Sequence, residues 1–179
     1  FMVKATDPRT IRTRQLIIDA FNELLVTKGF EQMTVKDITE RATINRATFY
    51  AHFVDKYALL EEVLTELIER IMKESLEGIE TEELSEQVVV QYFLGIVRVH
   101  DQMYANCRRG YNSFTHTIDE KLKQYLVQAI EKRLPTEHRA NAVIIGWGLY
   151  GMYSDWDHHK GGDAAIYAKQ VAQPLLLLI

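Results

Sequence analysis

Apolar residues recur every three to four positions along most of this chain, which is the period of an amphipathic α-helix. The first periodic stretch begins at Asp7 and Pro8, a capping residue followed by the imino acid tolerated in a first helical turn, and it stops at Gly29. No stretch alternates between apolar and polar residues as a strand does, and the 179 residues include only nine glycines and three prolines. The pattern therefore predicts an all-α protein.

Two short helices separated by a tight turn are predicted after the first helix. Thr34 and Asp37 have the spacing of a capping box, which opens a helix that runs through Ala42. Asn45 is a capping residue for a second short helix over residues 46–53. A longer helix followed by this pair has the outline of a helix-turn-helix unit, although helical hairpins also occur in bundles that bind no nucleic acid.

The rest of the chain continues in longer helices. Asp55 caps a long amphipathic helix expected over residues 56–77, which Gly78 closes. Glycine and proline residues then divide the chain into four more predicted helices, at about 83–107, 113–134, 137–159 and 163–178. These later helices predict a helical bundle behind the helix-turn-helix unit.

The short helix over residues 46–53 has two faces. Phe49 and Phe53 lie one turn apart and are expected to pack inward, together with Ile38 and Ile44. The other side chains are then left to point outward: Arg46, Ala47, Thr48, Tyr50, Ala51 and His52. A short helix with small and cationic outward residues fits the major groove of DNA, where an arginine can bind a guanine edge.

Eight residues are the predicted DNA contacts: Thr34, Asn45, Arg46, Ala47, Thr48, Tyr50, His52 and Lys56. Thr34, Tyr50 and Lys56 are expected to bind phosphates, because the first two groups are hydroxyls and the third is a cation at a helix start. Other interpretations stay open at this stage. Tyr50 and His52 can pack on the first helix, Arg46 and Lys56 can be ordinary surface charges, and Thr34 caps a helix in either case.

Charge is distributed unevenly along the chain. Residues 1–60 carry nine Lys and Arg against seven Asp and Glu, whereas residues 61–179 carry twelve against eighteen, within a formal net charge of −4. The first third is therefore the part suited to approach a polyanion, although a surplus this small is a weak signal without the motif.

Residues 12–60 resemble the DNA-binding domain of the TetR family of bacterial regulators. The resemblance rests on several spaced features: Gly29-Phe30, Thr34-Val35, Ile38 with Ala42, the block from Thr48 to Phe53, and Asp55-Lys56. One departure is Ala47, where many members have glycine; both residues are small. The resemblance implies a helix-turn-helix DNA-binding domain over residues 2–55 and a ligand-binding and dimerisation domain over residues 56–179, with helix 56–77 connecting them.

The same resemblance implies a ligand-responsive, dimeric transcriptional regulator, with repression as the expected mode. Such a protein binds a palindromic double-stranded DNA operator through the helix near residues 45–53, and a small molecule in the C-terminal bundle releases it. Two alternatives remain: a transcriptional activator with the same head, or a helical protein-interaction module that has lost DNA binding. Binding to DNA that is insensitive to ionic strength would favour the second, because phosphate contacts release counterions.

Aromatic residues and methionine are concentrated in the back two thirds of the chain. Such residues line mostly apolar ligand pockets, and they also build bundle cores. The predicted pocket residues are Tyr92, Phe93, His100, Met103, Tyr104, Tyr111, Phe114, Trp147 and Tyr150. We expect a subset of them to border a cavity for an unknown small-molecule effector.

The last two predicted helices are more apolar than a solvated surface. The helix over residues 137–159 is apolar nearly all round, and its Gly146, Gly148 and Gly151 permit the close approach of another backbone. The segment over residues 163–178 ends in Pro174 and four leucines. We expect a homodimer through these two helices; the alternative is that they complete the core of one subunit.

Neither a metal site nor an enzyme active site is predicted. Asp157, His158 and His159 are adjacent, so they point in different directions on a helix, and no histidine pair has one-turn spacing for a metal. Glycine-rich phosphate loops and nucleophile elbows are absent from the sequence, so no cofactor is expected. Its one cysteine, Cys107, fits a reducing compartment, and no apolar stretch is long enough to span a membrane, so a cytoplasmic protein with no membrane partner is expected.

Overall fold

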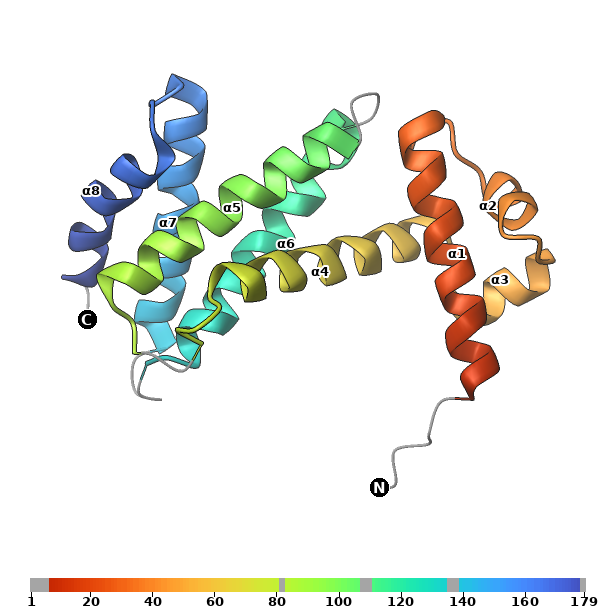
Figure 1. Cartoon of the computed structure of the whole chain (residues 1–179), viewed down its shortest axis with the longest axis horizontal. Helices are drawn as coiled ribbons and strands as arrows, with labels where there is room; N and C mark the ends of the chain where they lie inside the picture. The colour runs from red at the N-terminus through yellow and green to blue at the C-terminus, as the bar shows by residue number, and fades with distance from the viewer. Residues whose placement is uncertain (1–6, 81–82, 107–110, 135–138, 178–179) are drawn as a thin grey trace. The chain divides into compact units, whose positions relative to one another are not determined.

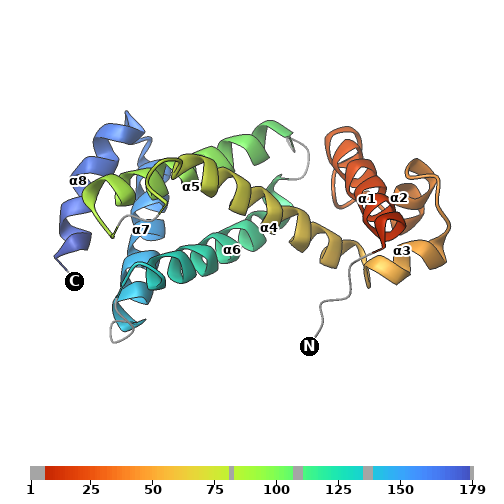
Figure 2. The ribbon, with the colours of Figure 1, turned by 60° about the horizontal axis from the view of Figure 1, so that its bottom comes forward.

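The computed structural model describes residues 7–80, 83–106, 111–134 and 139–177. Within these ranges the protein contains eight α-helices and no strand, so the all-α prediction is confirmed (Figures 1 and 2). The helices are α1 (Pro8–Thr27), α2 (Val35–Arg41), α3 (Arg46–His52), α4 (Lys56–Ser75), α5 (Glu86–Asn106), α6 (Tyr111–Glu131), α7 (Arg139–His159) and α8 (Ala164–Leu176).

The helix starts follow the predicted capping residues. Asp7 accepts a hydrogen bond from the backbone N–H of Arg9 at 3.0 Å. Thr34 and Asp37 form both halves of a capping box, and the side chain of Asn45 caps α3. These bonds satisfy backbone N–H groups that have no partner inside the helix, and they involve only residues two or three positions apart.

Helix ends differ from the predicted ones by up to three residues. The fourth helix ends at Ser75 rather than Glu77, and Gly78 follows in the left-handed conformation with φ +84°. The next helix starts at Glu86 and the one after it ends at Glu131, each three residues from the predicted position. Such ends depend on single hydrogen bonds at the last turn, which periodicity does not resolve.

The chain packs into two compact units, which we describe separately. One comprises Phe1–Val63 and Tyr104–Thr115, and the other comprises Leu64–Met103 and His116–Ile179. Packing therefore divides the chain inside α4 rather than at the predicted boundary between residues 55 and 56. The functional division into residues 2–55 and 56–179 stays a prediction.

Three helices, α1 to α3, form the main part of the first unit. The side chains of Ile17, Phe21, Ile38 and Phe49 are fully buried, and α2 packs on both α1 and α3. Each of these apolar side chains contributes roughly 1.5–3 kcal/mol when it leaves water. Burial of this small core fixes α3 against its support.

The second unit contains most of α4, α5, α6 and all of α7 and α8. Helices α7 and α8 lie side by side (Figures 1 and 2). A Cβ atom at Gly146 of α7 would lie only 3.1 Å from the backbone nitrogen of Val127 in α6. Glycine at this position therefore allows a close helix crossing, and the partner backbone belongs to the same subunit.

Candidate nucleic-acid interface and ligand cavity

Helix α3 is fixed to the first unit by one face. Phe49 is fully buried and Phe53 is 4% exposed, as predicted from their one-turn spacing. The guanidinium carbon of Arg14, on α1, lies 4.8 Å from the centre of the Phe53 ring. This cation–π contact adds about 0.5–1 kcal/mol to the apolar packing. The opposite face of α3 is exposed.

Arg46, Ala47 and Tyr50 are exposed on α3. Tyr50 is 54% exposed, and its ring packs edge-on against Phe49 at 5.5 Å. No described residue provides a hydrogen-bond or ion-pair partner for the Arg46 guanidinium or the Tyr50 hydroxyl. The two polar groups are therefore available to an external ligand, with the small Ala47 between them in sequence.

Asn45 and Thr48 are hydrogen bonded to each other at the start of α3. The Oδ1 atom of Asn45 accepts from the backbone N–H of Thr48 at 2.7 Å and from the Thr48 hydroxyl at 3.0 Å. The hydroxyl proton of Thr48 is thus used inside the helix, while the Thr48 methyl group is left for contact. His52 is half-buried, with its ring 6.4 Å from the Phe53 ring.

The donors of Thr34 are also used within the first unit. Both its backbone N–H and its hydroxyl donate to Oδ2 of Asp37, each at 2.7 Å. The ammonium group of Lys28 lies 2.7 Å from the same oxygen. These bonds, that of Lys28 first, lower the pKa of Asp37 from 3.8 to about 2. Thr34 therefore acts as a helix cap in the free protein.

Lys56 has three backbone carbonyl partners. Its ammonium group donates to the carbonyls of Met33 at 2.8 Å, Phe30 at 3.0 Å and Glu31 at 3.4 Å. It also lies 4.6 Å from the centre of the Phe30 ring. Three N–H donors matched to three carbonyls hold the segment between α1 and α2 in place. The phosphate contact predicted for Lys56 stays a prediction.

The turn between α2 and α3 contains a strained residue. Thr43 has φ +55°, in the left-handed region that β-branched residues rarely adopt. The backbone N–H groups of Thr43 and Ile44 nevertheless find carbonyl acceptors in Glu40 and Thr39. The tight turn is thus satisfied in hydrogen bonding, and its conformation sets the direction of α3.

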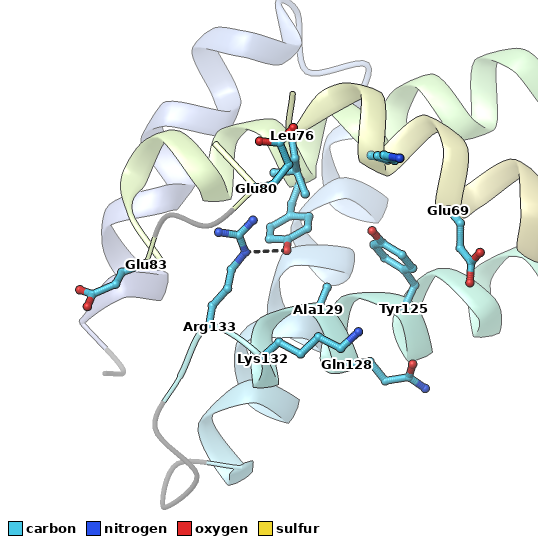
Figure 3. Close-up of a pocket in the computed structure, with 11 residues that line it drawn as sticks. Glu69, Leu76, Glu80, Glu83, Tyr125, Gln128, Ala129, Lys132 and Arg133 are labelled. Atoms are coloured by element: carbon cyan, nitrogen blue, oxygen red, sulfur yellow. Dashed lines mark hydrogen bonds between the residues drawn. The ribbon is translucent and has the colours of Figure 1, made fainter. Parts of the chain in front are cut away.

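A cavity of about 520 Å³ lies within the second unit (Figure 3). Helices α4, α5 and α6 and the segments that follow α4 and α6 provide its described lining, which consists of Glu69, Lys73, Leu76, Glu80, Glu83, Tyr92, Tyr125, Gln128, Ala129, Lys132 and Arg133. The Nε atom of Arg133 donates to the Tyr92 hydroxyl at 3.0 Å, and the guanidinium also reaches the Ile79 carbonyl at 3.3 Å. The cavity therefore combines aromatic, cationic and anionic groups.

Of the nine predicted pocket residues, Tyr92 is the one that belongs to this described lining. Phe93, Met103 and Tyr150 are buried in packing, whereas Tyr104 and Trp147 are more than half exposed. Phe114 is part of the first unit, and the Tyr111 side chain lies outside the described residues. Apolar periodicity identifies buried residues, but it does not show which of them border a cavity. Most of the other predicted pocket residues therefore lie in the packed core or on the surface.

Several lining residues were missed because they are charged. In sequence, Glu69, Lys73 and Lys132 follow the pattern of a solvated helix face, and their convergence depends on how α4 packs against α6. Lys132 and Arg133 form a short basic run at the end of a predicted helix. Such a run alone does not indicate a cavity.

His100 is buried within an aromatic cluster rather than in this cavity. Its ring stacks on Tyr153 at 4.7 Å, and its Nε2 atom lies 3.9 Å from Oδ1 of Asp119. Burial lowers the pKa of His100, while Asp119 opposes that shift. Phe93 extends the cluster through edge contact with Trp156 at 5.9 Å. These residues serve packing.

The last two helices each present an exposed apolar stripe. On α7, Ile144 is 53% exposed and Trp147 58%, and a Cβ atom at Gly151, one turn further along, would meet nothing within 4 Å. Ile166 on α8 and Leu177, which caps the end of that helix, are also exposed. These positions lie on one side of each helix, as expected for surfaces that pack against another element.

The described ranges contain neither a metal-binding cluster nor a membrane-spanning helix. No three His, Cys, Asp or Glu side chains there are grouped closely enough to hold a metal, and Cys107 is outside those ranges. None of the described helices is both long and apolar enough to cross a membrane.

Parts of this chain are similar in sequence to known proteins. Residues 17–63 match the family model described as "Bacterial regulatory proteins, tetR family". The uncharacterized HTH-type transcriptional regulator YxbF of Bacillus subtilis (strain 168) is 37% identical over 183 residues, which are 95% of this chain and 46% of that protein. The probable acrEF/envCD operon repressor of Escherichia coli (strain K12) is 30% identical over 105 residues, 54% of this chain and 48% of that protein. The chain spans about half the length of these curated relatives.

Solved structures share the fold. A TetR-family regulator from Streptomyces coelicolor A3 has a TM-score of 0.67 at 17% identity, covering 97% of this chain and 98% of that one. The multidrug binding protein EbrR, solved with imidazole, has a TM-score of 0.58 at 17% identity, covering 90% and 93%. The matched family, YxbF and the Streptomyces coelicolor A3 protein are all described as regulators. Residues 17–63 are therefore similar to the tetR family of bacterial regulatory proteins.

Proposed function

We propose that this protein is a dimeric, ligand-responsive transcriptional repressor that binds a palindromic DNA operator through α3. The observation that carries the proposal is the outward face of that helix. Arg46 and Tyr50 expose polar groups with no described partner, while Phe49 and Phe53 fix the helix from below. A rigid helix with an exposed cation and a small neighbour is suited to the major groove.

The eight predicted contacts are assigned two kinds of role in this proposal. Arg46 binds a guanine edge, Tyr50 and the Asn45 amide bind phosphates, and Ala47 and His52 face the bases. Thr34, Thr48 and Lys56 position the helices, since their donors are already hydrogen bonded inside the first unit. Any phosphate contact from these three requires an exchange of partners, which makes them weaker contributors.

Dimerisation is proposed through the exposed stripes of α7 and α8. Ile144, Trp147 and Ile166 are large apolar residues that a second copy would cover, and Gly151 allows close approach. Two copies would present two α3 helices to DNA about 34–36 Å apart, which is one turn of the double helix. This spacing matches a palindromic operator.

Release by a ligand is proposed through α4 and α6. Helix α4 begins at Lys56, which holds the segment after α1, and further along it carries Glu69 and Lys73 of the cavity. Helix α6 carries Phe114 at one end and Tyr125 of the cavity further along. A ligand that binds one arrangement of these helices more tightly shifts the DNA-binding equilibrium by that difference in affinity. The names of two relatives, an operon repressor and a multidrug binding protein, support repression and small-molecule binding.

Selection of DNA from a random pool, followed by footprinting, tests this function. We expect enrichment of inverted repeats whose half-sites lie about 10 base pairs apart, or a multiple of that spacing, with one dimer protecting both. Enrichment of single, unrepeated sites would contradict the proposal that a dimer binds two half-sites. Binding that does not weaken as salt rises would remove the phosphate contacts and favour a protein-interaction module.

A further inference from the structure

Hydrogen-bond donors in the 520 Å³ cavity exceed the partners that the described residues provide. The ammonium groups of Lys73 and Lys132 and the phenol of Tyr125 make no hydrogen bond to a described residue. The Tyr92 hydroxyl accepts from Arg133 and keeps its own proton to donate. Four side chains of one cavity therefore present protons to whatever occupies it.

The phenols remain donors at neutral pH. Burial raises the pKa of Tyr92, and Arg133 only partly offsets that shift. Burial, then Tyr92 and Glu69, raise the pKa of Tyr125 to about 12. Both phenols are therefore protonated under ordinary conditions and offer O–H groups to an acceptor.

The lining contains three acidic side chains, Glu69, Glu80 and Glu83, and three basic ones, Lys73, Lys132 and Arg133. Backbone N–H groups of Glu80 and Gly78 bind the Glu80 carboxylate and are the main reason for its lowered pKa. Glu69 and Glu83 lie at opposite ends of the cavity, with Arg133 and Lys132 between them (Figure 3). The middle of the cavity therefore contains several hydrogen-bond donors, while Glu80 offsets part of the charge of Lys73 and Arg133.

The size and the apolar part of the lining fit a small molecule. A volume of about 520 Å³ lies within the range of roughly 300–1,000 Å³ for such sites. Leu76 is 6% exposed and Tyr92 is 1% exposed, so both are part of the packed wall. Their apolar surfaces and Ala129 can cover the body of a ligand whose charged group reaches the lysines.

We propose that this cavity binds a small organic anion: a carboxylate, sulfonate or phosphate on an aromatic or aliphatic body. The anion accepts hydrogen bonds from Lys73, Lys132 and the two tyrosines, while its body lies against Leu76 and Ala129. The identification of this anion as the effector rests on the function proposed above. Its chemical class rests on the lining.

A matched pair of fluorescent probes tests the class of ligand. The anion is 8-anilinonaphthalene-1-sulfonate, and N-phenyl-1-naphthylamine is nearly the same molecule without the sulfonate. We expect the full chain to bind the sulfonate about tenfold more tightly, because charge-assisted hydrogen bonds add to the same apolar contact. Equal affinities, or preference for the uncharged probe, would overturn the proposal.

Charge-neutralising variants test where the sulfonate binds and whether positive charge in the cavity favours its binding. Lys132→Gln and Lys73→Gln are each expected to weaken sulfonate binding about fivefold and to leave binding of the uncharged probe unchanged. Lys169→Gln, at an exposed site on α8, is the control and should change neither. Glu69→Gln should strengthen sulfonate binding about twofold by removing a like charge. If none of the three cavity variants changed the affinity for the sulfonate, the assignment of the binding site to this cavity would be wrong.

The same samples separate this inference from the proposed function. Adding the selected operator DNA shows whether the sulfonate releases it. Tight, lysine-dependent sulfonate binding with no effect on DNA would uphold the anion site and contradict the ligand response. Operator binding by a protein with no preference for the sulfonate would uphold the regulator and contradict the anion site.

Discussion

Phe114, near the start of α6, packs edge-on against Phe30, with 6.0 Å between the ring centres. Phe30 makes similar edge contacts with Phe21 at 6.2 Å and Tyr57 at 5.3 Å. It therefore joins α1, α4 and α6 at one point in the first unit. The pair Gly29-Phe30, which carries part of the family resemblance, is thus a packing junction.

Truncation of Phe114 should destabilise the protein strongly. Its ring is 2% exposed, so Phe114→Ala leaves a cavity and should lower the free energy of unfolding by about 3–5 kcal/mol. Urea unfolding followed by circular dichroism measures this loss. Tyr104→Ala, at a residue that is 56% exposed in the same unit, is the control and should change stability by no more than about 0.5 kcal/mol. Equal losses in the two variants would show that the junction is not packed as described.

Replacement of Lys56 should affect stability more than DNA binding. Lys56→Met keeps most of the side-chain volume but leaves carbonyls of Phe30 and Met33 without their donor, at an expected cost of about 1–3 kcal/mol in unfolding free energy. Lys56→Arg should not restore this stability, because a planar guanidinium does not match three converging carbonyls. A stable Lys56→Met protein with weakened, less salt-dependent DNA binding would instead make Lys56 a phosphate contact.

Asp37 should make stability depend on pH in acid. Its pKa is lowered from 3.8 to about 2, so the folded state favours the carboxylate. The stabilisation is present above pH 3.8 and is lost as pH falls toward 2. We expect Asp37→Asn to cost about 1 kcal/mol at neutral pH, a modest value because Lys28 and Asp37 are partly exposed. The difference from the parent protein should shrink below pH 4, and a gap that stays constant down to pH 2.5 would contradict the assignment.

A glycine at position 43 should relieve backbone strain. Thr43→Gly removes the Cβ atom from a residue with φ +55°, a gain of about 1–2 kcal/mol that the greater freedom of glycine in the unfolded chain partly offsets. We expect a net increase of about 0.5–1 kcal/mol in unfolding free energy. Thr43→Ala keeps a Cβ atom and should gain less. A loss of stability in the glycine variant would show that the turn adopts another conformation.

Local rules predicted much of the fold and part of the interface. Asp7, Thr34 and Asn45 were identified as caps because their partners are two or three residues away, and Phe49 and Phe53 were placed inward by their spacing. The three carbonyl partners of Lys56 lie 23 to 26 residues earlier in the chain, so no local sequence pattern predicts these hydrogen bonds. The cavity was missed for the same reason, since Glu69 and Lys132 are far apart in sequence and line the same cavity only in the folded protein.

The central claim is that the outward face of α3 binds DNA through phosphates and base edges. Fluorescence anisotropy with a selected operator, measured over a series of salt concentrations, compares Arg46→Ala with Arg70→Ala. Arg70 is an exposed arginine on α4, paired with Glu74, and serves as the matched loss of charge. We predict that Arg46→Ala weakens specific binding by about 1–3 kcal/mol and relaxes preference at one base position, while Arg70→Ala matches the parent protein. Equal affinities for parent, Arg46→Ala and Arg70→Ala would contradict the account.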